Sequence, residues 1–255
     1  MVGSSEAATA TRTETAGPPL RLVAVTHGSP SPANRAAVIR LVDGVATARP
    51  DLDVSISFVD ARSTDVAAAV AGDSAAPGAA IVPLVLSAGF HVRTGLALGL
   101  DRIGGPSGLA PELGPDPRIA EVLAERLEAL ELTDRDAILL AAAGSNDPRA
   151  VRECFETARL LAQRLSRPVT VGFIAAGLPR LPDAIEMVRE VHPGARIVVG
   201  AYLLAPGAFY DTAAALGGDV IADPLLLPDR AAPAPLVELV LDRYTAVELV
   251  HGGSA

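Results

Sequence analysis

The chain has 255 residues, of which 50% are hydrophobic and 20% charged, so it can bury a core of one or two domains and is not disordered throughout. Its net charge is −9, the wrong sign for a surface that follows a nucleic-acid backbone, and no apolar stretch reaches the roughly 18 residues needed to cross a bilayer. All 21 basic residues are arginine, which excludes Schiff-base lysine and P-loop chemistry. We therefore expect neither nucleic acid nor a membrane as a partner.

Residues 1–19 are rich in Ala, Thr, Ser, Gly and Pro and lack the basic start and apolar middle of a signal peptide. We expect a disordered tail over 1–19 and a cytoplasmic protein. Cys154 is the single cysteine, so no internal disulfide or Cys-x-x-Cys metal site is possible. A metal would have to be bound by histidine and carboxylate side chains.

The first half of the chain alternates short apolar runs with segments of helical spacing. Gly and Pro are dense over 104–116, which predicts a loop, and Asp116-Pro117 is typical of a helix start. The pattern predicts strands over 21–26, 54–58 and 79–87, and helices over 32–49, from 63 or 64 to about 70, and from 117 to 130.

The same order of elements returns from Asp136 onward, with strands over 137–142 and 169–174 and a helix over 148–165. The offset is 116 from Gly28 to Gly144, and nearly the same offset relates Phe58 to Phe173 and Ala88 to Ala205. Agreement in three places indicates an internal duplication.

These elements predict an α/β fold of two tandem halves, each a parallel sheet flanked by helices. We place the N-terminal half at 20–131 and a degenerate C-terminal half at 132–250. Ligands of open α/β sheets bind outside the carboxyl ends of the strands. The predicted cleft therefore lies between the halves, where the loops bearing His27, Asp60 and His91 emerge.

His27 and His91 each follow a predicted strand of the first half, and neutral imidazole suits Fe²⁺, Co²⁺ and Ni²⁺. The alternative is that both are core histidines satisfied by the backbone. The second half places Ala143 at the position of His27 and has Ala208-Phe209 where His91 would fall. The fold therefore does not require either histidine, and a functional role is favoured.

The other candidates leave alternatives open. Asp60 follows the second strand and is a solvated loop carboxylate, a helix cap or a third ligand in the cleft. His192 lies at a predicted helix end and His251 in a Gly-Ser tail, so both are expected to be structural or incidental. Cys154 lies on an apolar helix face and is expected to be a small core residue.

Four motifs resemble those of the sirohydrochlorin and cobalt chelatases, the class II chelatases that insert a divalent metal into a reduced tetrapyrrole. The resemblance spans nearly the whole chain. The motifs are Val-Ala-Val-Thr-His27-Gly-Ser, Val-Pro-Leu-Val-Leu-Ser-Ala-Gly-Phe-His91-Val-Arg93, Leu-Gly-Pro-Asp-Pro-Arg118 and Tyr-Leu-Leu-Ala-Pro206-Gly-Ala-Phe209-Tyr-Asp211.

The resemblance implies that His27 and His91 handle the metal and act in catalysis, with Asp60 at a position commonly occupied by Glu. It also implies a metal, Fe²⁺ or Co²⁺, as substrate and no organic cofactor. Sirohydrochlorin is a polycarboxylate, so an acidic protein needs local positive donors to bind it. We expect these near Ser29, at a predicted helix start, and at Arg93.

Iron insertion for siroheme biosynthesis is the first expectation, and cobalt insertion for cobalamin biosynthesis is the alternative. A metal or tetrapyrrole carrier without turnover would have a similar sequence. The histidine phosphatases also place His-Gly after a first strand, but they need Arg immediately before the His, where this chain has Thr26. Because the second half supplies the opposite wall of the cleft, we expect a monomer with one site.

Overall fold

The computed structural model describes residues 19–27, 31–59, 76–87, 96, 100 and 107–252. Strands and helices alternate along these residues, as the sequence predicts. In chain order the elements are β1 (Arg21–His27), α1 (Pro32–Ala48), β2 (Val54–Val59), β3 (Ala79–Pro83), β4 (Ser107–Leu109), α4 (Pro117–Glu128), β5 (Ala137–Gly144), α5 (Pro148–Leu165), β6 (Val169–Ala176), α6 (Leu181–Val191), β7 (Ile197–Tyr202), α7 (Ala208–Ala215), β8 (Val220–Ile221) and α8 (Ala234–Gly252).

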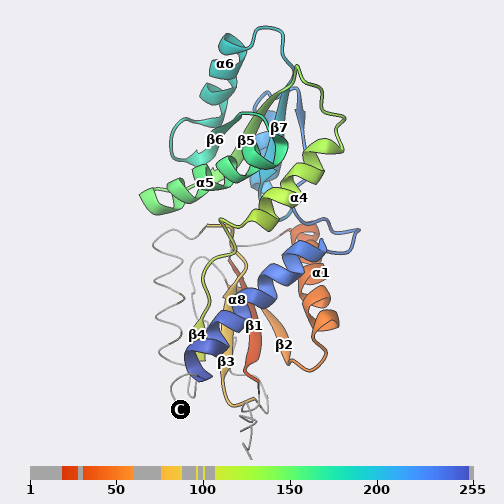
Figure 1. The fold of residues 1–255 in the computed structure, drawn as a ribbon, viewed down its shortest axis with the longest axis vertical. Coiled ribbons are helices and arrows are strands. Elements are labelled where there is room, and N and C mark those ends of the chain that lie inside the picture. The colour runs from red at the N-terminus through yellow and green to blue at the C-terminus, as the bar shows by residue number, and fades with distance from the viewer. Residues whose placement is uncertain are drawn as a thin grey trace, which may run out of the picture.

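The strands form two four-stranded parallel sheets, in the orders β2-β1-β3-β4 and β6-β5-β7-β8. The two orders are the same when each half is numbered from its own first strand. Helices flank both sheets (Figure 1). The predicted fold class is therefore confirmed. In each sheet the first strand of the half lies between the second and the third, so the carboxyl ends of these three strands are neighbours.

Two expectations about the third unit were wrong. The strand predicted over 79–87 ends at Pro83, because the chain then changes partner: the carbonyls of Val85 and Leu86 accept hydrogen bonds from Leu113 and Gly114. The Gly- and Pro-rich loop predicted over 104–116 contains β4, which pairs in parallel with β3. Tertiary pairing overrides the weak strand propensity of Ser-Gly-Leu.

The two halves exchange their last helices. Helix α4 packs against α5 and β7 of the second half, and α8 packs against α1, β3 and β4 of the first. In Figure 1, α8 runs along the lower sheet although it is the last element of the chain. The boundaries at 20–131 and 132–250 remain our proposed limits of the sequence repeat, but each packing unit includes a helix from the other range.

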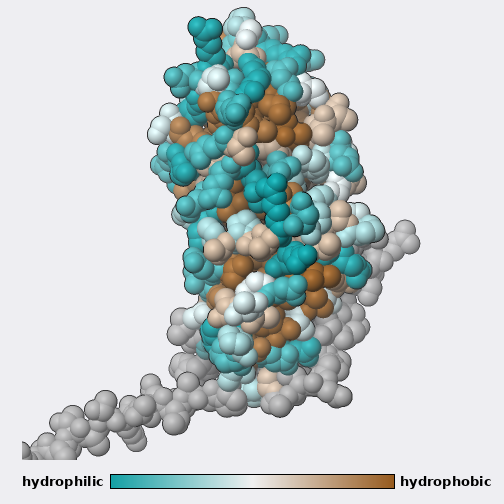
Figure 2. All heavy atoms as spheres, turned by 90° about the vertical axis from the view of Figure 1, so that its right-hand side faces the viewer, coloured by the Kyte–Doolittle hydropathy of each residue, from teal (hydrophilic) through white to brown (hydrophobic). Residues whose placement is uncertain are grey.

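One apolar cluster joins the halves: it contains Leu22 and Val82 of the first sheet as well as Leu140 and Val198 of the second. On the face shown in Figure 2, hydrophobic side chains occur as separate areas among hydrophilic ones. No helix within the described residues is long and apolar enough to cross a membrane. The tail predicted over 1–19 and the helix predicted from 63 or 64 lie outside the described residues, apart from Pro19.

Candidate active site

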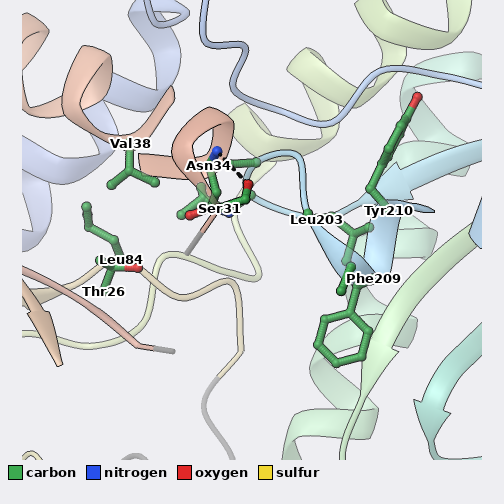
Figure 3. A pocket seen from close by; sticks show the side chains of 12 residues that line it. Thr26, Ser31, Asn34, Val38, Leu84, Leu203, Phe209 and Tyr210 are labelled. Carbon is green, nitrogen blue, oxygen red and sulfur yellow. Dashed lines mark hydrogen bonds between the residues drawn. The ribbon is translucent and has the colours of Figure 1, made fainter. Parts of the chain in front are cut away.

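A cavity of about 500 Å³ lies between the halves, at the carboxyl ends of β1 and β3 (Figure 3). The first half contributes the end of β1, the start of α1 and the residue after β3, and the second half contributes the segment from β7 into α7. The lining residues are Thr26, Ser31, Asn34, Val38, Leu84, Leu203, Leu204, Ala205, Gly207, Ala208, Phe209 and Tyr210. The position of the cavity agrees with the predicted cleft.

The start of α1 connects the two walls. Ser31 is the N-cap, and its hydroxyl accepts a hydrogen bond from the backbone N–H of Asn34 at 3.2 Å. The Asn34 amide Nδ2 in turn donates to the carbonyl oxygen of Pro206 at 2.9 Å. This bond between α1 and the α7 segment holds the walls at a fixed separation. Sequence reasoning missed Asn34, for which the only signal was an amide in the first turn after the first strand.

None of the described lining residues is charged, and the polar ones are a threonine, a serine, an asparagine and a tyrosine. The N-cap residues of both α1 and α7 line the cavity, so the positive ends of two helix dipoles lie in this region, an arrangement that favours anions. Burial raises the pKa of Tyr210, with Asp223 and Asp211 adding to the effect, so its phenol stays neutral at physiological pH.

Arg35 places a cation beside the first wall. Its guanidinium carbon lies 4.1 Å from the centre of the Phe58 ring, a cation–π contact, and Phe58 pairs with Thr26 of the cavity wall. Arg35 is exposed and forms no ion pair with any residue that the structure describes. Arg35 was not among the predicted site residues, because nothing in the sequence pattern distinguishes it from the other arginines.

The predicted site residues fall largely outside the described part. His27 is the last residue of β1 and pairs with Val59 of β2, but its side chain is not described. Ser29, Asp60, His91 and Arg93 lie outside the described residues. Within those described, no group of three or more His, Cys, Asp or Glu could hold a metal. The convergence of the predicted ligands therefore stays a prediction.

The register of the sheets identifies the counterparts of two of these residues. Thr26 pairs with Phe58 and Ala142 pairs with Phe173, so Ala143 corresponds to His27. After a shift of register on β6, Gly144 pairs with Ala176. Because Gly144 corresponds to Gly28, the residue after His27, its partner Ala176 corresponds to Asp60, the residue after Val59.

The third counterpart follows from hydrogen bonds beyond β3 and β7. Val85 accepts from Leu113 at 3.0 Å, and Leu203 accepts from Leu225 at 3.1 Å in the same arrangement. This sets the offset at 118, and the sequence count then pairs His91 with Phe209. The second half thus has alanine, alanine and phenylalanine where the first has His27, Asp60 and His91, and it forms the same sheet without them.

A second contact between the halves lies behind the cavity. The buried Tyr202 hydroxyl of β7 donates to the carbonyl oxygen of Leu86 at 3.1 Å, and Gly114 leaves room for this approach. The counterpart of Tyr202 is Leu84, which has no hydroxyl, so the bond has no equivalent in the other direction. Nearby, burial raises the pKa of the Cys154 thiol to about 11, and this side chain is the core residue that the sequence predicts.

The CbiX family model matches residues 21–130 and 137–217, which is more than half of the chain. The chain belongs to the CbiX family. This result confirms the predicted resemblance to the class II chelatases, which rested on sequence motifs in both halves of the chain. No curated protein sequence matches the chain.

Solved structures share the fold of this CbiX-family chain. SirB from Bacillus subtilis with Fe³⁺ has a TM-score of 0.67 at 16% identity, covering 92% of this chain and 98% of SirB. A structure of CbiX described as the terminal enzyme for biosynthesis of siroheme in denitrifying bacteria has a TM-score of 0.60 at 21% identity, covering 89% of this chain and 98% of its own. SirB from Bacillus subtilis subspecies spizizenii, a sirohydrochlorin chelatase in complex with cobalt, has a TM-score of 0.57 at 15% identity, covering 92% and 98%. At these identities the likeness shows the fold.

Proposed function

We propose that this CbiX-family chain is a sirohydrochlorin chelatase, a lyase-class enzyme that inserts a divalent metal, Fe²⁺ in the first instance, for siroheme biosynthesis. The observation that carries the proposal is the cavity between the halves, at the carboxyl end of the strand that finishes at His27. Family membership supports the reaction class. The similar structures support the choice of substrate and metal. One SirB structure holds Fe³⁺, another is a sirohydrochlorin chelatase with cobalt, and the CbiX structure is described as an enzyme of siroheme biosynthesis.

Metal insertion needs two things from the protein. The hydrated cation must lose water, and two pyrrole N–H protons must leave as the metal binds the ring nitrogens. Imidazole serves both needs, because it ligates Fe²⁺ and Co²⁺ and has a pKa close to neutral. In our proposal His27 and His91 share these tasks, and Asp60 orients an imidazole or attracts the incoming cation.

The carboxylates of sirohydrochlorin require positive donors at the rim of a cavity whose described lining is uncharged. Arg93 and the helix start near Ser29 are the donors that the sequence suggests. Arg35 joins them, because it is exposed beside the first wall and its guanidinium contacts the Phe58 ring. Arginine suits this task, since its planar fork matches a carboxylate.

The proposal is tested by anaerobic incubation of the protein with sirohydrochlorin and Fe²⁺, Co²⁺ or Ni²⁺ in turn, following the absorbance change on metallation. Catalysed insertion of iron supports the proposal, and insertion of cobalt in its place supports the alternative role in cobalamin biosynthesis. Stoichiometric binding with no increase in insertion rate would identify a carrier instead. The cytoplasmic location predicted from the sequence is part of the same proposal.

Asp60→Asn is expected to retain measurable insertion activity, reduced about tenfold, because asparagine keeps a polar side chain of the same size but cannot contribute negative charge. The absence of a carboxylate at Ala176, its counterpart, indicates that the variant will fold. The rate of insertion under saturating metal measures the effect. A loss as deep as that of the histidine variants would show that Asp60 carries catalysis.

One tetrapyrrole is expected to bind per chain, because the second half has no histidine at the counterparts of His27 and His91 and already forms the opposite wall. Titration of the 26.0 kDa chain with sirohydrochlorin should therefore saturate at one equivalent. Activity per chain should also stay constant on dilution through the range in which light scattering reports a monomer. Two equivalent sites, or activity lost as a dimer dissociates, would contradict the single-site assignment.

A further inference from the structure

Phe209 is an exposed aromatic side chain on the wall of the cavity between the halves. It is 47% exposed at the first turn of α7, while most large apolar side chains of the described residues are buried. Its ring projects from the second wall, and the ring of the next residue, Tyr210, points the other way (Figure 3). An exposed phenyl ring on the wall of a cavity offers apolar surface to a ligand that enters it.

The internal repeat shows how Phe209 differs from the other residues that replace the predicted ligands in the second half. At the counterparts of His27 and Asp60 the second half has alanine, which has a small apolar side chain. At the counterpart of His91 it has Phe209, which is large, cannot ligate a metal and is half exposed. A site that had merely lost its ligands would have no need of a phenyl ring there. The second half thus has an aromatic residue at the sequence position where the first half has a histidine.

Resting on the proposed function, we propose that Phe209 is the surface on which the tetrapyrrole macrocycle stacks. The conjugated ring presents a broad π-face, which a phenyl ring contacts in an offset arrangement, and Leu203 and Leu204 extend the apolar wall beside it. The second half then holds one face of the macrocycle and leaves the other face to the half that bears the histidines. Phe209 is a substrate-positioning residue, and metal capture does not depend on it.

The test compares Phe209→Ala and Phe209→Leu with Phe155→Ala, a matched control at a phenylalanine that is 45% exposed and does not line this cavity. The measurements are the Kd for metal-free sirohydrochlorin, from its absorbance and fluorescence, the KM for sirohydrochlorin, and the KM for Co²⁺. Phe209→Ala should weaken sirohydrochlorin binding about tenfold, raise its KM to a similar extent and leave the KM for Co²⁺ within about twofold of wild type. The Kd and KM of Phe209→Leu for sirohydrochlorin should lie between those of the wild type and Phe209→Ala. Phe155→Ala should have the wild-type values.

Unchanged sirohydrochlorin binding by Phe209→Ala would overturn the proposal, as would a variant whose Co²⁺ KM rises while its sirohydrochlorin Kd does not. A melting scan of each variant checks folding. If Phe209→Ala does not fold, the Kd of Phe209→Leu for sirohydrochlorin decides, and a wild-type value would overturn the proposal. Absence of insertion by the wild-type protein would refute the proposed function, whereas the direct binding measurement would still decide whether Phe209 stacks on the macrocycle.

Discussion

His91→Ala is expected to lower the rate of metal insertion by at least about 10²-fold while leaving the melting temperature close to that of the wild type. The loss follows from removing a group that both ligates the metal and accepts a proton, because general base catalysis alone contributes roughly 10² to 10⁴ in rate. The fold should persist because the second half has Phe209 at the corresponding position and still forms its sheet. Anaerobic insertion assays and thermal melts measure the two effects separately.

His192→Ala is the matched control, since His192 is an exposed histidine at the end of α6, in the second half. It should retain wild-type insertion. Near-normal insertion by His91→Ala would refute the assignment of His91. Unfolding of that variant would show that the imidazole serves the structure of the first half, which is the alternative that the sequence left open.

Local signals were sufficient for much of the fold. Helix α5 was predicted over 148–165 and has these bounds in the structure. Pro148 begins it, and the carboxylate of the N-cap residue Asp147 accepts a hydrogen bond from the N–H of Arg149. The duplication was readable because the strand ends recur at a nearly constant offset. The exchange of α4 and α8 was not predictable, because an apolar helix face does not specify which of two similar sheets it covers.

Some features of the candidate site were likewise predictable from the sequence and others were not. The cleft between the halves followed from the parallel sheets, whose strand ends meet at one edge. The bond from Asn34 to Pro206 joins residues far apart in the sequence, so no local pattern indicates it. Arg35 is likewise defined by its place over Phe58 and not by its neighbours in the chain. Contacts between distant segments are what the structure adds to the motifs.

Gly144→Ala is expected to destabilise the fold by about 3 kcal/mol or more, which lowers the melting temperature of a chain of this size by roughly 6–12 °C. Gly144 has φ of +89°, a conformation unfavourable for any residue with a Cβ. A Cβ there would also lie 1.7 Å from the carbonyl oxygen of Ala176, where β6 shifts register against β5. Neither strand can move away without breaking the ladder between β5 and β6. Thermal and urea unfolding measure the loss.

Gly194→Ala separates the two causes. Gly194 also has positive φ, at +78°, but a Cβ there would meet nothing within 4 Å, so only the conformational strain of about 1 kcal/mol remains. Its melting temperature should fall by roughly 2–4 °C. Equal losses in the two variants would show that the approach of Gly144 to Ala176 is not tight. A larger loss at Gly144 would establish that the close approach of β5 to the carbonyl of Ala176 requires a glycine at this position.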